Sequence, residues 1–392
     1  MRRLTLTAAA LAASVLLVTG CAATLSTDAT TTDTSASSST TTTSDTSTST
    51  STSTDTGSTS GDIDWSALPS TEVELTDEGL TITEAGTYVL SGSTTGQIVV
   101  NTDGNVRVIL NGVAIDSTDG AAIQVDSAEN TVIELADGTT NSISDASTRS
   151  DEEIDGAIYS ADDLLITGTG ELTVTANFAD GIVGKDDLWI ESGTITVTSV
   201  DDGIRGTDSL TVSGGTITVD AEGDGLKSTN DTDAGEGQLV ISGGDITVTS
   251  GDDAVKAEQQ VTITGGTIDV VSSVEGIEAP VIVIDDGTIS INASDDGINA
   301  AASAIVTSGL SVTIGGGDIT IVMGSGDTDA IDSNGDITIT GGTIDITAQS
   351  ATDFDGTGTL SGGTLTVNGS EVTELTSQMM GGGMGGGGGQ RP

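Results

Sequence analysis

The stretch that decides the fold reads Asp202-Gly-Ile-Arg-Gly206, then Leu210-Thr-Val-Ser-Gly-Gly-Thr-Ile-Thr-Val219, then Asp224-Gly-Leu-Lys-Ser228. Similar runs return about every 22 residues, which is the sequence signature of a repeat architecture. Longer spacings carry inserted loops, such as the one at 229–237. The units begin at Asp155, Asp180, Asp202, Asp224, Asp253, Glu275, Asp296 and Asp329, and a degraded unit follows at Asp353.

Each unit holds short segments in which apolar and polar residues alternate. In 216–219, Ile217 and Val219 share one face while two threonines take the other, as in a strand with one buried side. Leu210 and Val212 repeat this pattern one turn earlier, and Ile204 supplies a third inward position. No helical periodicity appears, and a propeller would need repeats of about 40 residues. The pattern therefore predicts an all-β fold, a right-handed parallel β-helix wound as a single-stranded solenoid with coils of about 22 residues.

The composition narrows the functional classes. Only 2% of residues are aromatic against 34% hydrophobic, and 55 glycines accompany three prolines, which suits stacked strands joined by many tight turns. A formal net charge of −51 excludes non-specific nucleic-acid binding and disfavours adhesion to anionic lipid. The absence of His excludes imidazole catalysis and His-ligated zinc. Binding of hard cations through oxygen, Ca²⁺ above all, is left open.

The chain divides into five predicted parts. Residues 1–20 have a basic start and a short apolar stretch, as in a signal peptide, and Val18-Thr-Gly-Cys21 resembles a lipobox. We expect lipidation of Cys21, with the membrane reached only through this anchor and the protein on the extracellular face of the cell membrane. Residues 21–61 read as a disordered Ser/Thr-rich stalk, 62–145 as an N-terminal cap with the first coils, 146–372 as the repetitive domain and 373–392 as a disordered Gly/Met tail. We expect a monomer.

The first residue of every unit is an acid, and a second acid often precedes it. Coils stacked about 4.8 Å apart would align these carboxylates, at about 1 kcal/mol of repulsion per neighbouring pair in water. Either the carboxylates accept hydrogen bonds from turn amides, or Ca²⁺ lies between adjacent coils. A turn needs only one acid, so the doubled acids favour Ca²⁺. The candidate ligands are Asp201, Asp202, Asp224, Asp252, Asp253, Asp295 and Asp296.

Basic residues are few but aligned. Arg205, Lys227 and Lys256 each follow the repeat acid by three positions, and Lys185 lies near the same edge. They either neutralise the acids or form a cationic groove that clamps carboxylates of a polysaccharide. Trp189, between inward-facing neighbours, is expected to point outward, as a sugar-stacking platform or as a cover for Leu165.

The ordered combination of these motifs resembles a known family. Gly138-Thr-Thr-Asn-Ser-Ile-Ser-Asp145, Asp155-Gly-Ala-Ile-Tyr-Ser160 and the repeated Asp-Gly-Ile/Leu-Lys and Ser-Gly-Gly-Thr-Ile-Thr-Val runs resemble secreted bacterial carbohydrate-binding β-helix proteins, related in shape to pectate lyases. The resemblance covers about residues 70–370. It implies binding of cellulose or acidic, pectin-like polymers with Ca²⁺ on Asp-rich turns, most plausibly at Asp201, Asp202, Asp224, Asp252 and Asp253.

The preferred function is thus a non-catalytic, Ca²⁺-dependent surface module for polysaccharide, carried by Lys185, Trp189, Arg205, Lys227 and Lys256. One alternative is a polysaccharide lyase, in which Arg205, Lys227 or Lys256 would act as the base. Another is a structural or adhesive protein whose Ca²⁺ only stabilises it. Ice binding by the Thr-x-Thr ladder is disfavoured, because aspartates interrupt that ladder at 245, 269, 318 and 345.

Overall fold

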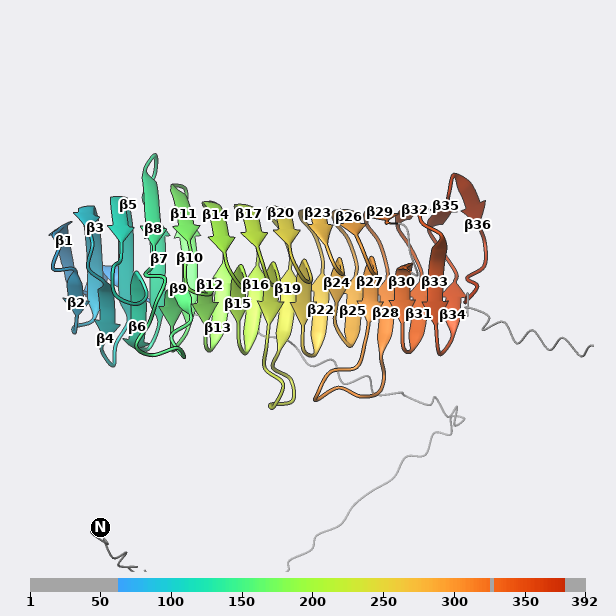
Figure 1. Cartoon of the computed structure of the whole chain (residues 1–392), viewed down its shortest axis with the longest axis horizontal. Coiled ribbons are helices and arrows are strands. Elements are labelled where there is room, and N and C mark those ends of the chain that lie inside the picture. The colour runs from blue at the N-terminus through green and yellow to red at the C-terminus, as the bar shows by residue number, and fades with distance from the viewer. Residues whose placement is uncertain (1–62, 325–327, 378–392) are drawn as a thin grey trace, which may run out of the picture. The chain divides into compact units, whose positions relative to one another are not determined.

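The computed structural model describes residues 63–324 and 328–377, and these residues form a parallel β-helix. Successive coils lie side by side along the stack (Figure 1). The predicted fold class is confirmed. The signal peptide, Cys21, the stalk and residues 378–392 of the expected tail lie outside the described residues.

Most coils contribute three strands, which stack into three columns; in the first coils the long strands β3 and β5 continue from the first column into the second. The first column contains β1 (Ser70–Leu75), β3 (Gly86–Thr94), β5 (Val106–Asp116), β7 (Thr131–Leu135), β10 (Leu164–Gly168), β13 (Asp187–Ile190), β16 (Ser209–Val212), β19 (Gln238–Ile241), β22 (Gln260–Ile263), β25 (Val281–Ile284), β28 (Ser311–Ile314), β31 (Asp336–Ile339) and β34 (Gly358–Leu360). The second contains β8 (Thr140–Ser144), β11 (Glu171–Thr175), β14 (Thr194–Ser199), β17 (Thr216–Ala221), β20 (Asp245–Ser250), β23 (Thr267–Ser273), β26 (Thr288–Ala293), β29 (Asp318–Met323), β32 (Thr343–Thr347), β35 (Thr364–Val367) and β36 (Ser370–Val372). The third contains β2 (Leu80–Ile82), β4 (Ile98–Asn101), β6 (Ile123–Ser127), β9 (Gly156–Ser160), β12 (Asp180–Gly184), β15 (Ile204–Gly206), β18 (Leu226–Ser228), β21 (Val255–Ala257), β24 (Ile277–Glu278), β27 (Ile298–Ala300), β30 (Asp329–Ser333) and β33 (Ser350–Phe354).

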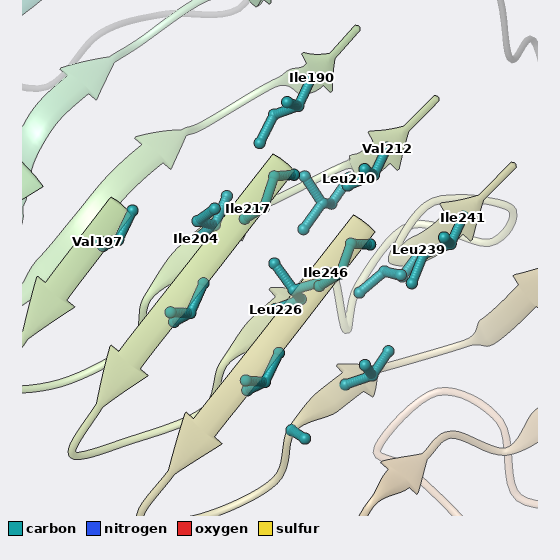
Figure 2. Close-up of a cluster of buried hydrophobic side chains, with 14 of the residues drawn as sticks. Ile190, Val197, Ile204, Leu210, Val212, Ile217, Leu226, Leu239, Ile241 and Ile246 are labelled. Atoms are coloured by element: carbon teal, nitrogen blue, oxygen red, sulfur yellow. The ribbon is translucent and has the colours of Figure 1, made fainter. Parts of the chain in front are cut away.

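Register follows the sequence repeat because each apolar residue stacks on its counterpart in the next coil. Ile195 pairs with Ile217 and Ile217 with Ile246, all at most 1% exposed. Figure 2 shows Ile217 and Ile246 beside Leu210, Leu226 and Leu239 in this core. Burying one such side chain contributes about 1.5–3 kcal/mol, so the interior ladder is the main stabilising term.

The Gly-Gly corner between the first two columns needs both glycines, for different reasons. Gly215 has φ +94, in the left-handed region that side chains rarely adopt. A Cβ on Gly214 would lie 2.4 Å from the carbonyl oxygen of Glu191 in the coil before. One glycine therefore permits the turn and the other permits the close stacking.

Within the described residues, the only helix is the short 3₁₀ turn η2 (Trp65–Ala67), and no helix is long and apolar enough to span a membrane. At the other end β36 pairs antiparallel with β35. The packed chain continues past 372, the expected end of the repetitive domain, because Leu375 is buried and Ser377 Oγ donates to Asp353 Oδ1 at 2.5 Å.

Candidate cation and glycan site

The repeat acids line up at the corner between the second and third columns and form what we call the acid ladder. The amide of Asp202 donates to Asp180 Oδ1 at 3.1 Å, and that of Asp224 donates to Asp202 Oδ1 at 2.9 Å. Asp253 bonds Asp224 in the same way, also at 2.9 Å. One oxygen of each of these acids thus accepts the backbone N–H of its counterpart in the next coil. The acid ladder comprises Asp180, Asp202, Asp224, Asp253, Glu275, Asp296 and Asp329.

Three residues after each acid lies a second aligned set, which we call the outward column. Strand pairing places it in the order Arg205, Lys227, Lys256, Glu278, Asn299, Asp332. Lys227 Nζ bridges two acids of the ladder, with Asp224 Oδ2 at 2.7 Å and Asp202 Oδ2 at 3.0 Å.

The neighbours of Lys227 in the outward column make equivalent bridges. Lys256 Nζ bridges Asp253 Oδ2 at 2.7 Å and Glu278 Oε2 at 2.6 Å. Arg205 pairs with Asp180 at 2.6 Å and also with Asp155. The cations of the outward column therefore neutralise the acid ladder by taking its second carboxylate oxygen.

Burial and neighbouring charges raise the pKa values of some members of both sets. Burial lowers the pKa of Lys227, but Asp202 and Asp224 outweigh it, so the net pKa is raised. Burial raises the pKa of Asp180 to about 6 even though Arg205 opposes the shift. It also raises the pKa of Glu275 to about 8, with Glu278 adding repulsion. Burial thus favours the protonated form of these acids, and the basic side chains do not fully offset that effect.

Two triads of carboxylates form where a second acid precedes the ladder residue. The first is Asp180, Asp201 and Asp202, and its potential ligand oxygens lie within 4.8 Å of one another. The second, Asp224, Asp252 and Asp253, repeats this geometry. Oxygens that share one Ca²⁺ ion at 2.3–2.6 Å can be up to about 5 Å apart, so both triads fit that ion. Asp201 and Asp252 are exposed, which leaves the triads open to solvent.

The structure changes the predicted ligand set in part. It brings Asp201, Asp202, Asp224, Asp252 and Asp253 into triads and adds Asp180, whose repeat position was the available signal. Among the described residues, Asp295 and Asp296 join no such group of three. A third group, Asp253 with Glu275 and Glu278, was not predicted, because Glu278 occupies a position that is basic in the preceding coils.

Of the residues predicted to contact glycan, Trp189 does not lie where it was expected. Trp189 is only 5% exposed, so the prediction of an exposed stacking platform is wrong. Its ring does lie outside the core, but it packs with Leu165 and Val132 beneath Trp65. It therefore acts as the cover for Leu165 that was its alternative interpretation.

Lys185 lies at the edge of the acid ladder, as expected. Its ammonium is 3.7 Å from Asp155 and 5.9 Å from the centre of the Tyr159 ring, and its side chain is 32% exposed. Lys227 and Lys256 are partly exposed, and Arg205 is mostly turned toward the acids. The basic residues can still reach a ligand at their outer edges, but their first role is neutralisation.

A second acidic cluster lies at the corner between the third and first columns, and sequence reasoning missed it. Burial and Asp187 raise the pKa of Asp163 to about 6. Burial and a shared hydrogen bond with Asp208 raise that of Asp186 to about 6. The doublets Asp162-Asp163 and Asp186-Asp187 were the available signal.

Comparison with known proteins identifies the family of the chain. A family model described as carbohydrate-binding domain-containing protein matches residues 76–328. The chain belongs to this family. A curated relative from Acetivibrio thermocellus, also described as a carbohydrate-binding domain-containing protein, is 34% identical over 133 residues. That match spans 32% of this chain and 46% of the relative, so the chain spans about half of the relative's length.

A solved structure is also similar, described as the polysaccharide lyase-like protein from C. thermocellum in a gadolinium derivative. It is 33% identical, with a TM-score of 0.48, and the match covers 53% of this chain and 96% of that one. The predicted resemblance to a carbohydrate-binding family is confirmed.

Proposed function

We propose that this member of the carbohydrate-binding family is a non-catalytic, Ca²⁺-dependent polysaccharide-binding protein, with acidic pectin-like chains as the first candidates and cellulosic chains as the second. The observation that carries the proposal is the pair of open carboxylate triads, two coils of the helix apart, beside partly exposed ammonium groups. Ca²⁺ bound at a triad would supply a bridge to a uronate carboxylate. Lys227 and Lys185 would contact further carboxylates of the same chain.

The electrostatics of the ladder argue against the lyase alternative. A lyase needs a basic side chain that is neutral enough to take a proton from the sugar. Here the acids raise the pKa values of Arg205, Lys227 and Lys256, so all three stay protonated and are poor bases. Binding without bond cleavage is the function that this arrangement supports best.

We further propose that the protein is displayed at the extracellular face of the cell membrane through lipid on Cys21. The lipobox-like sequence supports this part of the proposal. Metabolic labelling with a fatty-acid analogue should label the full chain, and Cys21→Ser should abolish the label.

The binding test uses calorimetric titration of the protein with polygalacturonate, with Ca²⁺ and then with EDTA. We expect binding only with Ca²⁺, and a loss of at least tenfold in affinity for Asp201→Asn/Asp252→Asn. The matched control is Asp220→Asn, because Asp220 is an equally exposed acid outside the triads. Equal binding in EDTA would refute the Ca²⁺ dependence, and appearance of unsaturated product by absorbance would restore the lyase alternative.

A further inference from the structure

The basic residues of the outward column stop before its acids do. After Lys256 the sequence contains no Lys or Arg until Arg391. The column nevertheless continues with Glu278, Asn299 and Asp332 beside the ladder acids Glu275, Asp296 and Asp329. The coils after Lys256 therefore stack carboxylates with no cationic side chain of the described chain between them.

Asn299 has an unusual position within these coils. It is only 8% exposed, and strand pairing places it between Glu278 of the coil before and Asp332 of the coil after. Its Nδ2 donates to Glu275 Oε2 at 3.0 Å. Its Oδ1 is buried and accepts no hydrogen bond.

A buried carbonyl oxygen without a donor is destabilising unless something satisfies it. The in-register neighbours of Asn299 are carboxylates, which accept and do not donate when ionised. Turning the amide over would point its oxygen at Glu275, which could donate to it only while protonated. In the orientation that the structure shows, Nδ2 donates to Glu275 and Oδ1 is left for another partner. The group that fits this position is a cation that binds oxygen.

We propose that Glu275, Glu278 and Asn299 Oδ1 hold one divalent hard cation of the Ca²⁺ class, with Asp332 as a further oxygen ligand from the next coil. The ion takes the place that lysine and arginine occupy in the preceding coils. Lys256 bridges only Glu278 and Asp253, so Glu275 and the amide oxygen are left for the ion. None of the proposed ligands is a triad member, although Asp253 of the second triad lies beside Glu275 and Glu278. The site does not depend on glycan binding.

The test counts Ca²⁺ ions by calorimetric titration and measures melting temperature with Ca²⁺ and with EDTA. Asn299→Lys extends the cationic column by one coil. We expect it to bind one ion fewer than the parent, to melt at a higher temperature than the parent in EDTA, and to show a smaller upward shift with Ca²⁺. Asn292→Lys is the matched control, since it adds the same charge on the exposed face of β26 and should leave the ion count unchanged.

An unchanged ion count with unchanged affinities in Asn299→Lys would overturn the site. If Asn299→Lys does not fold, Asn299→Asp serves as the second test, because it keeps a side-chain oxygen at this position and adds a negative charge. We expect Asn299→Asp to melt lower in EDTA and to bind one Ca²⁺ at least tenfold more tightly, and parent-like values would overturn the proposal. The triads stay intact in Asn299→Lys, so this variant should still bind polygalacturonate in the presence of Ca²⁺. If the proposed glycan-binding function is wrong, the parent protein itself will not bind polygalacturonate, and that result is independent of the ion count at Asn299.

Discussion

Replacing Lys227 by Met should destabilise the β-helix, and by more than the same replacement at Lys185. Its ammonium bridges Asp202 and Asp224 at 3.0 and 2.7 Å, and both carboxylates are nearly buried, at 6% and 2% exposed. Met keeps most of the volume of the stem and removes only the charge. Each acid would retain the amide bond to its Oδ1, so the loss is confined to Oδ2.

The size of the effect follows from that geometry. Removing one partner of a buried ion pair costs about 3–5 kcal/mol because the remaining charge is left uncompensated. The side chain of Lys227 is 23% exposed, so water recovers part of the loss. We therefore expect a decrease of about 2–4 kcal/mol in the free energy of unfolding, before any screening by salt.

Urea denaturation at pH 7 in EDTA, followed by circular dichroism, measures this difference. Lys185→Met is the matched control, because Lys185 pairs with one carboxylate, that of Asp155 at 3.7 Å, and is 32% exposed. It should lose less than about 1 kcal/mol. Equal losses in the two variants would show that bridging of the ladder is not what makes Lys227 matter.

Three further outcomes follow from the structure. Burial raises the pKa of Asp163 to about 6, above its unfolded value, so that carboxyl opposes folding as the pH rises through 6. Asp163→Asn should therefore raise the urea midpoint at pH 8 but not at pH 4. An equal gain at both pH values would contradict the raised pKa of Asp163. Gly341→Ala would place Cβ 1.9 Å from the carbonyl oxygen of Gly315 and should lower the urea midpoint strongly. Gly138→Ala should lower it less, because the new Cβ meets open space and the free energy of unfolding falls by only about 1–2 kcal/mol for the left-handed φ. Trp189→Ala should lower the free energy of unfolding by about 3–5 kcal/mol, while the folded variant keeps its affinity for glycan. A loss of glycan binding without a loss of stability would instead support the interpretation of Trp189 as a sugar-stacking platform.

The register of the stack was predictable because the repeat itself encodes it. An inward isoleucine about 22 residues after another must lie above it once the coils are parallel. The alignment of Arg205, Lys227 and Lys256 followed from the same count, and strand pairing confirms it. Five of the predicted metal ligands also fall into the triads, since each doubled acid shares one corner.

The contacts that sequence reasoning missed are those that the repeat does not encode. Trp65 comes before the first unit, so no periodicity indicated that it would cover Trp189. Whether the ammonium of each lysine contacts the acid ladder or solvent depends on the conformation of its side chain, which the spacing of residues in the sequence does not determine. Asn299 lies in the register that the repeat spacing implies, but its unpaired oxygen depends on the direction in which its amide points.

The repeat acids do accept hydrogen bonds from backbone amides, but those bonds account for only one of the two carboxylate oxygens. Oδ1 of Asp202 accepts the amide of the next coil, while Oδ2 faces the position three residues after a repeat acid. Every added coil therefore brings one carboxylate oxygen that backbone stacking cannot satisfy. What occupies that oxygen depends on a single residue per coil, which is Lys at 227 and 256 but Asn at 299. Because a lysine supplies its own charge and an asparagine does not, the same backbone can be stable without metal in one stretch and depend on a bound cation in the next.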